Sequence, residues 1–274
     1  TQQKRDHSRP APGEPKTAGE ASSSVQEQHR HSERLLHDRM RAIRHKVLVF
    51  SGKGGVGKST VSANLAAAAA AAGWRVGLLD IDFHGPSIPR LFGLASEHAV
   101  GDGETIVPLA PIPNLRLMSL GLLLESPEDA VIWRGPMKTG VIQQLLRDVE
   151  WGELDVLIID SPPGTGDEPL SVCQSIPDVD GAILVTTPQD LSVADVKRSI
   201  GFCRKLDLSI LGLVENMSGF RCPGCGAVTD ILKSGGGQDL AQQAGIPFLG
   251  RIPMDPAVVT ACDDGQALSA AGDH

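Results

Sequence analysis

Short apolar runs alternate with longer segments of helical spacing along the chain from about residue 46 onward. Several of these runs end at Asp, Thr or a glycine loop, and we expect buried strands at 46–50, 76–80, 156–160, 182–186, 210–215 and 248–252. Helices are predicted between them at 59–72, 139–149, 192–206 and 238–244. Apolar strands separated by helices predict an α/β fold, with a mostly parallel central sheet and helices on both faces.

The N-terminal part of the chain lacks this alternation. Residues 1–32 are rich in Gln, Ser, Pro, Glu and His, and such a composition buries too little apolar surface to offset the entropy of ordering. We therefore expect a disordered tail there. Apolar residues near helical spacing predict a short lead-in helix at 33–45. The alternating strands and helices that follow are expected to form a single domain at 46–274.

Composition and charge narrow the classes of partner. The chain has 274 residues, of which 41% are hydrophobic, so it can bury a substantial core. Its net charge is −8 and no dense basic stripe is present, which argues against nucleic acid and against a membrane surface as partners. Because the sequence shows neither a long apolar run nor a secretory signal, we expect a cytoplasmic protein.

The stretch SGKGGVGKST, at 51–60, fits the phosphate-loop pattern G-x-x-x-x-G-K-S. Lys58 is expected to neutralise the β and γ phosphates, Ser59 to ligate Mg²⁺ and Thr60 to reach the α phosphate. A predicted strand before the loop and a predicted helix after it favour this interpretation over an ordinary glycine-rich turn. The backbone N–H groups that would surround the phosphates belong to Gly52, Gly54, Gly55, Val56 and Gly57.

Carboxylates follow two of the predicted strands. Asp82 lies just beyond the strand at 76–80 and is the candidate that positions the attacking water, although a turn or helix-cap role is the alternative. Asp160 ends an apolar strand, as expected of a Walker B carboxylate that holds Mg²⁺ through water. Gly164, in the following Pro-Pro-Gly-Thr-Gly run, is the predicted switch residue.

The chain has five cysteines, of which only Cys222 and Cys225 are closely spaced, in the motif CPGC. A C-x-x-C pair fits zinc, an iron–sulfur cluster, a redox disulfide or a plain turn, and it supplies half of a four-coordinate site. Cys173, Cys203 and Cys262 are isolated and are expected to be buried small hydrophobes. A two-fold dimer would bring a second pair of thiolates to the axis.

Several motifs together resemble a known family. Lys53, directly after the first loop glycine, gives a deviant Walker A motif similar to that of the family of MinD, ParA, the ArsA pump ATPase and the nitrogenase iron protein. Within that family, the sequence resembles the Mrp/ApbC branch of ATP-dependent iron–sulfur cluster carriers. The motifs that carry this second resemblance are DIDFHGPSIPRLFG, WRGPM, IIDSPPGTGDE, TTPQ, NMSGF, CPGC and RIPMDP.

This resemblance implies a homodimer in which Lys53 reaches the partner's nucleotide. It also implies that Asn216 reads the adenine edge and that the turn from Pro253 to Asp255 closes over the base. Cys222 and Cys225 of both chains are implied to hold a bridging 4Fe–4S cluster. ATP and Mg²⁺ are the implied cofactors, and apo iron–sulfur proteins are the implied clients. Two alternatives stay open, namely a MinD/ParA-like positioning ATPase and a regulatory ATPase whose dimer is stapled by zinc at the same cysteines.

Overall fold

The computed structural model describes residues 18–83, 85–123 and 135–266. Within these residues the strands are β1 (Ile43–Ser51), β2 (Val76–Asp80), β3 (Val100–Gly101), β4 (Ile106–Val107), β5 (Leu115–Ser119), β6 (Leu154–Asp160), β7 (Gly181–Thr186), β8 (Ile210–Arg221), β9 (Val228–Thr229) and β10 (Phe248–Met254). The helices are α1 (Ala18–Arg41), α2 (Lys58–Ala71), α3 (Ile88–Leu91), α4 (Gly135–Arg147), α5 (Asp167–Ser175), α6 (Asp190–Lys205), α7 (Gly236–Ala244) and α8 (Pro256–Asp263), with a 3₁₀ turn η1 (Leu120–Leu123).

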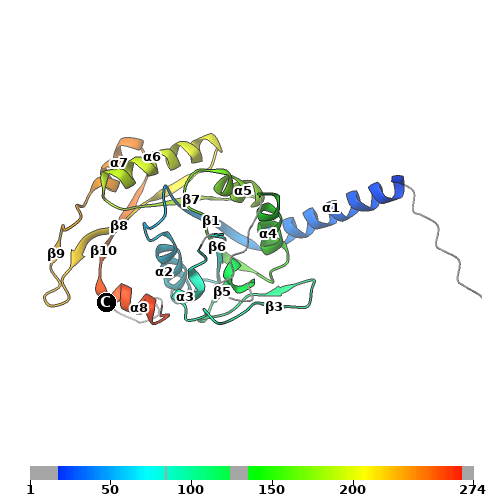
Figure 1. The fold of residues 1–274 in the computed structure, drawn as a ribbon, viewed down its shortest axis with the longest axis horizontal. Helices are drawn as coiled ribbons and strands as arrows, with labels where there is room; N and C mark the ends of the chain where they lie inside the picture. The colour runs from blue at the N-terminus through cyan, green and yellow to red at the C-terminus, as the bar shows by residue number, and fades with distance from the viewer. Residues whose placement is uncertain (1–17, 84, 124–134, 267–274) are drawn as a thin grey trace, which may run out of the picture. The chain divides into compact units, whose positions relative to one another are not determined.

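The main sheet has the strand order β10-β8-β7-β1-β6-β2-β5, and neighbouring strands on this path are parallel. Strand β9 pairs antiparallel with β8, and β3 pairs antiparallel with β4 in a separate ribbon. Figure 1 shows α2, α3 and α8 on one side of the sheet and α5, α6 and α7 on the other. The predicted α/β architecture is therefore confirmed.

Strand β1 lies at the centre of the sheet, between β6 and β7. Its residues Leu48, Val49 and Phe50 are almost fully buried, as expected for a parallel strand that is covered on both faces. Because β1, β2, β6 and β8 run in the same direction, their carboxyl ends lie along one edge of the sheet. The glycine loop after β1, the carboxylates after β2 and β6, and Asn216 in β8 are thus brought to one region.

The prediction for the N-terminal part of the chain is wrong in two places. Helix α1 begins at Ala18, so the segment from Ala18 to Ser32 is helical where a disordered tail was predicted; its Ala, Glu, Gln and Arg residues favour a helix and it contains no proline. The rest of that predicted tail, residues 1–17, lies outside the described residues. The predicted lead-in helix at 33–45 is also too long at its end, because Ile43 is buried and pairs with Leu154 as the first residue of β1.

The described residues divide into two compact units between Leu35 and Leu36, so the larger unit begins earlier than the predicted domain start at residue 46. The predicted strand at 210–215 continues to Arg221 in the structure. The edge strand β5 and helix α5 were not predicted from the sequence. In the described part of the chain, no helix combines the length and apolar character needed to cross a bilayer.

Candidate functional site

The phosphate loop connects the buried end of β1 to the first turn of α2. Gly57 has φ 79°, in the left-handed region that favours glycine. A Cβ atom there would also lie 2.3 Å from Nδ2 of Asn216, so this position has no room for a side chain. Asn216 in turn donates a hydrogen bond from Nδ2 to the carbonyl oxygen of Val56, at 2.9 Å. Strand β8 therefore holds the loop directly.

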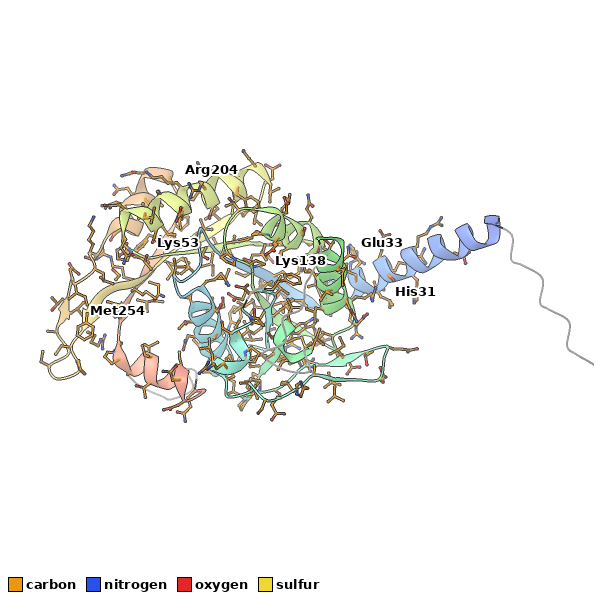
Figure 2. All side chains as sticks on the ribbon, in the orientation of Figure 1. His31, Glu33, Lys53, Lys138, Arg204 and Met254 are labelled. Atoms are coloured by element: carbon orange, nitrogen blue, oxygen red, sulfur yellow. The ribbon has the colours of Figure 1, made fainter. Side chains whose placement is uncertain are left out.

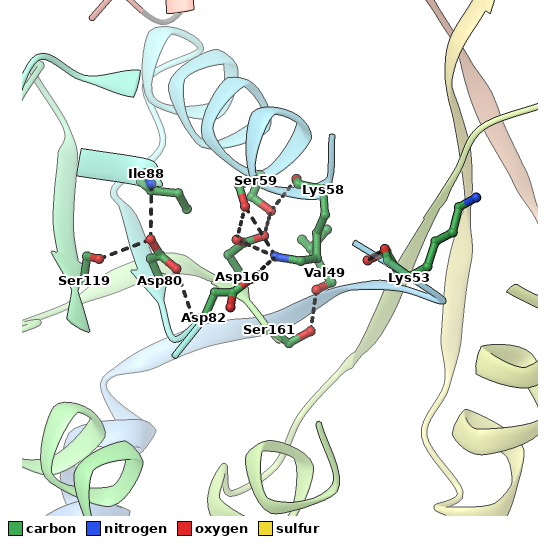
Figure 3. A network of polar contacts seen from close by, with 12 residues as sticks. Val49, Lys53, Lys58, Ser59, Asp80, Asp82, Ile88, Ser119, Asp160 and Ser161 are labelled. Atoms are coloured by element: carbon green, nitrogen blue, oxygen red, sulfur yellow. Dashed lines mark hydrogen bonds and ion pairs between the residues drawn. The ribbon is translucent and has the colours of Figure 1, made fainter. Parts of the chain in front are cut away.

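Asp160 is the centre of a buried polar cluster (Figure 3). Its Oδ2 atom accepts hydrogen bonds from Nζ of Lys58 at 2.7 Å and from Oγ of Ser59 at 2.6 Å. Its Oδ1 atom accepts one from Oγ of Ser62 at 2.6 Å. Ser62 was missed by sequence reasoning, although it lies one turn after Ser59 on α2. The Ser59 hydroxyl and the Asp160 carboxylate give an all-oxygen donor set of the kind that Mg²⁺ prefers.

Two further carboxylates lie beside this cluster. Oδ2 of Asp82 is 3.9 Å from Nζ of Lys58, so that one ammonium faces both Asp82 and Asp160. Asp80 is fully buried and pairs in register with Asp160 on the neighbouring strand. Burial, and after it the charge of Asp160, raises the pKa of Asp80 to about 7. Asp80 accepts hydrogen bonds from the backbone N–H groups of Asp82 and Ile88 and from the Ser119 hydroxyl.

The loop after β6 returns to the phosphate loop. The backbone N–H of Gly164 donates to the carbonyl oxygen of Ser51 at 2.9 Å, and Gly164 has φ 92°. The Ser161 hydroxyl donates to the carbonyl oxygen of Val49 at 2.7 Å. The predicted switch residue is thus hydrogen-bonded to the residue that immediately precedes the phosphate loop.

A cavity of about 1200 Å³ begins at the phosphate loop and is lined by residues of α2, β8, β10 and α8. Gly57, Thr60, Asn216 and Pro253, which were assigned to the nucleotide from the sequence, all line it. Its other walls are largely apolar, which suits a planar base, and include Val61, Ile183, Val214, Met217, Phe220, Ile252 and Met254. Asp255, at the end of the turn that was expected to close over the base, also lines it, as does Asn64, which was not singled out from the sequence.

Lys53 lies apart from the Asp160 cluster. Figure 3 shows its side chain directed away from Lys58, on the far side of the loop. Among the described residues, its ammonium forms neither a hydrogen bond nor an ion pair, whereas its backbone carbonyl accepts a hydrogen bond from Ser51. The side chains of the two loop lysines therefore point in different directions: Lys58 points toward Asp160 and Lys53 points away from it.

The CPGC motif forms the tip of the hairpin between β8 and β9. The N–H of Cys222 donates to the carbonyl oxygen of Ala227 at 2.9 Å, and the N–H of Gly226 donates to that of Cys222 at 2.8 Å. The backbone N–H of Gly224, then the N–H and the thiol of Cys225, hold the pKa of Cys222 below its ordinary value. The Cys225 side chain is exposed. Within the described residues no three His, Cys, Asp or Glu side chains form a metal-binding group, so the hairpin offers two thiols.

The remaining cysteines differ from this pair. Cys203 is buried, and desolvation raises the pKa of Cys173 to about 12 and that of Cys203 to about 11. Burial also raises the pKa of Cys262. Burial thus favours the protonated thiol at these three residues, whereas the pKa of Cys222 is shifted in the opposite direction.

Residues 42–274 match the sequence model of a protein family, the NUBPL-type iron-transfer P-loop NTPases within the ParA group. The chain belongs to this family. It is 51% identical over 230 residues to the iron–sulfur cluster carrier protein of Methanocaldococcus jannaschii, covering 84% of this chain and 79% of that protein. It is 50% identical over 227 residues to the human cytosolic Fe-S cluster assembly factor NUBP2, covering 81% of this chain and 84% of that protein.

Solved structures agree with this assignment. A nucleotide-binding protein from Archaeoglobus fulgidus, solved in complex with ADP, superposes with a TM-score of 0.76 at 39% identity, over 87% of this chain and 93% of that chain. MinD from Pyrococcus horikoshii, solved with Mg-ADP, has a TM-score of 0.57 at 23% identity, over 81% and 86% of the two chains, and shows likeness of fold. The resemblance inferred from the motifs is therefore confirmed at the level of the NUBPL-type family and its MinD/ParA-like fold.

Proposed function

We propose that this P-loop NTPase binds and hydrolyses ATP and carries a 4Fe–4S cluster, which two copies of the chain bind between them and transfer to apo-proteins. The observation that carries the proposal is the course of strand β8. Asn216 in this strand holds the phosphate loop, and Cys222 follows the end of the same strand. One continuous element thus joins the nucleotide site to the thiols. The names of the two relatives support the choice of an iron–sulfur cargo and, for the human one, a cytosolic location.

The nucleotide site supports hydrolysis of a γ phosphate. Lys58 would exchange its contact with Asp160 for the β and γ phosphates, while Thr60 and the loop N–H groups would hold the α and β phosphates. When bound through Ser59 and, by way of water, Asp160, Mg²⁺ would offset charge on the transferred phosphoryl group. Asp82, beside Lys58, would orient the attacking water. The water oxygen would bond to the γ phosphorus as the bond to the β–γ bridging oxygen breaks, giving ADP and phosphate.

The dimer would complete both sites. Lys53 projects away from its own Asp160 cluster, which supports a role toward the nucleotide of a second chain. A second cation near the γ phosphate would stabilise the charge that develops there. Two hairpins meeting at a two-fold axis would combine their cysteines into the four thiolates that a 4Fe–4S cluster needs.

A pair of charged side chains also connects the hairpin to the nucleotide cavity. Nε of Arg221, at the end of β8, lies 3.6 Å from Oδ2 of Asp255, which lines the cavity and caps the N-terminus of α8. The backbone of Phe220 pairs with Met254 in the same region. Occupation of the base site would therefore change the surroundings of Arg221, the residue immediately before Cys222.

The test is the content of iron, acid-labile sulfide and zinc in protein reconstituted without oxygen, measured beside a Cys222→Ala/Cys225→Ala variant and a Cys173→Ala control. We expect about two irons and two sulfides per chain, retained in the control and lost in the double variant, together with ATP hydrolysis and transfer to an apo-ferredoxin. About half a zinc per chain with little sulfide would instead support the zinc-stapled regulatory ATPase. ATP-dependent binding to DNA or liposomes would support a positioning ATPase.

A further inference from the structure

Lys138 contacts both of the chain segments that lead away from the Asp160 cluster. It lies on α4, and its ammonium forms an ion pair with Oε1 of Glu168 on the first turn of α5. The same ammonium lies 5.2 Å from the centroid of the Phe83 ring, within the range of a cation–π contact. Figure 2 labels Lys138 beside α4 and α5.

The two partners of Lys138 come from different loops. Phe83 directly follows Asp82, whose carboxylate is 3.9 Å from the ammonium of Lys58. Glu168 follows the loop after β6, which leaves Asp160 and is tied to Ser51 through Gly164. The segment after β2 and the segment after β6 therefore meet at one side chain outside the phosphate cluster.

The low exposure of both side chains indicates that the ion pair between Lys138 and Glu168 is held in one arrangement. The Lys138 side chain is 13% exposed and that of Glu168 is 26% exposed. Lysine is seldom buried to this degree unless its charge is paired, and an ammonium that has lost most of its water interacts more strongly with a carboxylate and an aromatic face. The phosphate-loop chemistry described above does not use this residue.

We propose that Lys138 is a positioning residue for ATP hydrolysis. Its contact with Phe83 holds Asp82, and its ion pair with Glu168 holds the loop after Asp160. Lys138 thereby fixes the position of Asp82 relative to that loop. This inference rests on the proposed hydrolysis. If Asp82 orients the attacking water, its placement relative to the γ phosphate sets kcat, whereas the loop N–H groups and Lys58 set ATP binding. Loss of Lys138 should therefore lower kcat much more than it raises KM.

The test compares Lys138→Met, Lys138→Arg and, as a matched control, Lys205→Met at an exposed position in the last turn of α6. We expect kcat to fall about tenfold or more in Lys138→Met, with KM for ATP within roughly threefold, recovery of most of the rate in Lys138→Arg, and no change in the control. An unchanged kcat in Lys138→Met would overturn the proposal. So would a parallel loss of ATP binding and melting temperature, because that pattern indicates a structural role alone.

Hydrogen exchange separates this inference from the proposed function. If wild-type protein does not hydrolyse ATP, the proposed function fails and the effect on kcat fails with it, whereas the link that Lys138 makes between the two segments is still tested on the ADP-bound protein. Faster amide exchange in both 81–83 and 164–168 of Lys138→Met, with Lys138→Arg close to wild type, supports a link between the two segments. Exchange that is unchanged, or changed in one segment only, overturns it.

Discussion

The ammonium of Lys58 lies 2.7 Å from Oδ2 of Asp160, and the two side chains are 6% and 0% exposed. Asp160 thus forms with Lys58 the ion pair that the phosphates of a bound nucleotide would replace. Ser59 and Ser62 donate hydrogen bonds to the same carboxylate, so Asp160 keeps two donors when Lys58 moves to a nucleotide. Lys58 can therefore exchange its ion pair with Asp160 for one with the phosphates while the Asp160 carboxylate keeps its hydrogen bonds from Ser59 and Ser62.

Replacing Lys58 with Ala should abolish nucleotide binding and also destabilise the nucleotide-free protein. Removing one partner of a buried ion pair costs about 3 kcal/mol of the free energy of unfolding. Chemical denaturation with and without ADP measures both effects. The matched comparison is Lys58→Ala combined with Asp160→Asn, which should recover part of the lost stability because no unpaired charge remains. Tight ADP binding by Lys58→Ala would contradict the assignment.

Replacing Lys53 with Ala should have a different effect. Because its ammonium points away from the Asp160 cluster, we expect nucleotide affinity to change by less than about threefold, while dimer-dependent hydrolysis is lost. Calorimetric titration with a non-hydrolysable ATP analogue and a phosphate-release assay at several protein concentrations check this. Equal loss of nucleotide binding in Lys53→Ala and Lys58→Ala would exclude the role across the dimer.

Asp80 should make stability depend on pH near neutrality. Burial, and then Asp160, raises its pKa from 3.8 to about 7 in the folded protein, so the folded state holds this proton more tightly than the unfolded state. Its contribution to stability is fully present below about pH 4 and is lost as the pH rises toward 7, at up to about 1.4 kcal/mol per pH unit. Urea denaturation of Mg²⁺-free protein at pH 5 to 7.5 should show a shallower fall in Asp80→Asn. Parallel curves for the two proteins would refute this prediction.

Thiol reactivity should follow the environments of the cysteines. The pKa of Cys222 is lowered by the N–H groups of Gly224 and Cys225, whereas burial raises that of Cys173 and Cys203. We expect iodoacetamide at neutral pH to modify Cys222 first and the buried thiols last. Mass spectrometry of peptides after timed quenching measures the order. Loading the protein with iron and sulfide should protect the cysteines of the hairpin and leave the modification rates of the other cysteines unchanged. Labelling of Cys203 ahead of Cys222 would contradict the hairpin geometry described above.

The sequence determined the α/β class and the location of the phosphate loop, because both depend on local patterns. Apolar runs such as 46–50 identify buried strands, and the glycine spacing before Lys58, between a strand and a helix, is typical of a phosphate-binding loop. The N-terminal helix shows the limit of this reasoning. Low apolar content predicted disorder up to Ser32, yet helix α1 begins at Ala18, because helix propensity does not require burial.

The tertiary structure decided which groups face one another across the sheet. Asp80 and Asp160 are 80 positions apart, and only the pairing of β2 with β6 places both carboxylates at the same register and raises the pKa of one. Likewise, the contact of Lys138 with both Phe83 and Glu168 depends on how three elements pack. The sequence by itself determined the residue types and the local turns of the nucleotide site. The order of the strands, which no local pattern encodes, set the charges that act on each of its carboxylates.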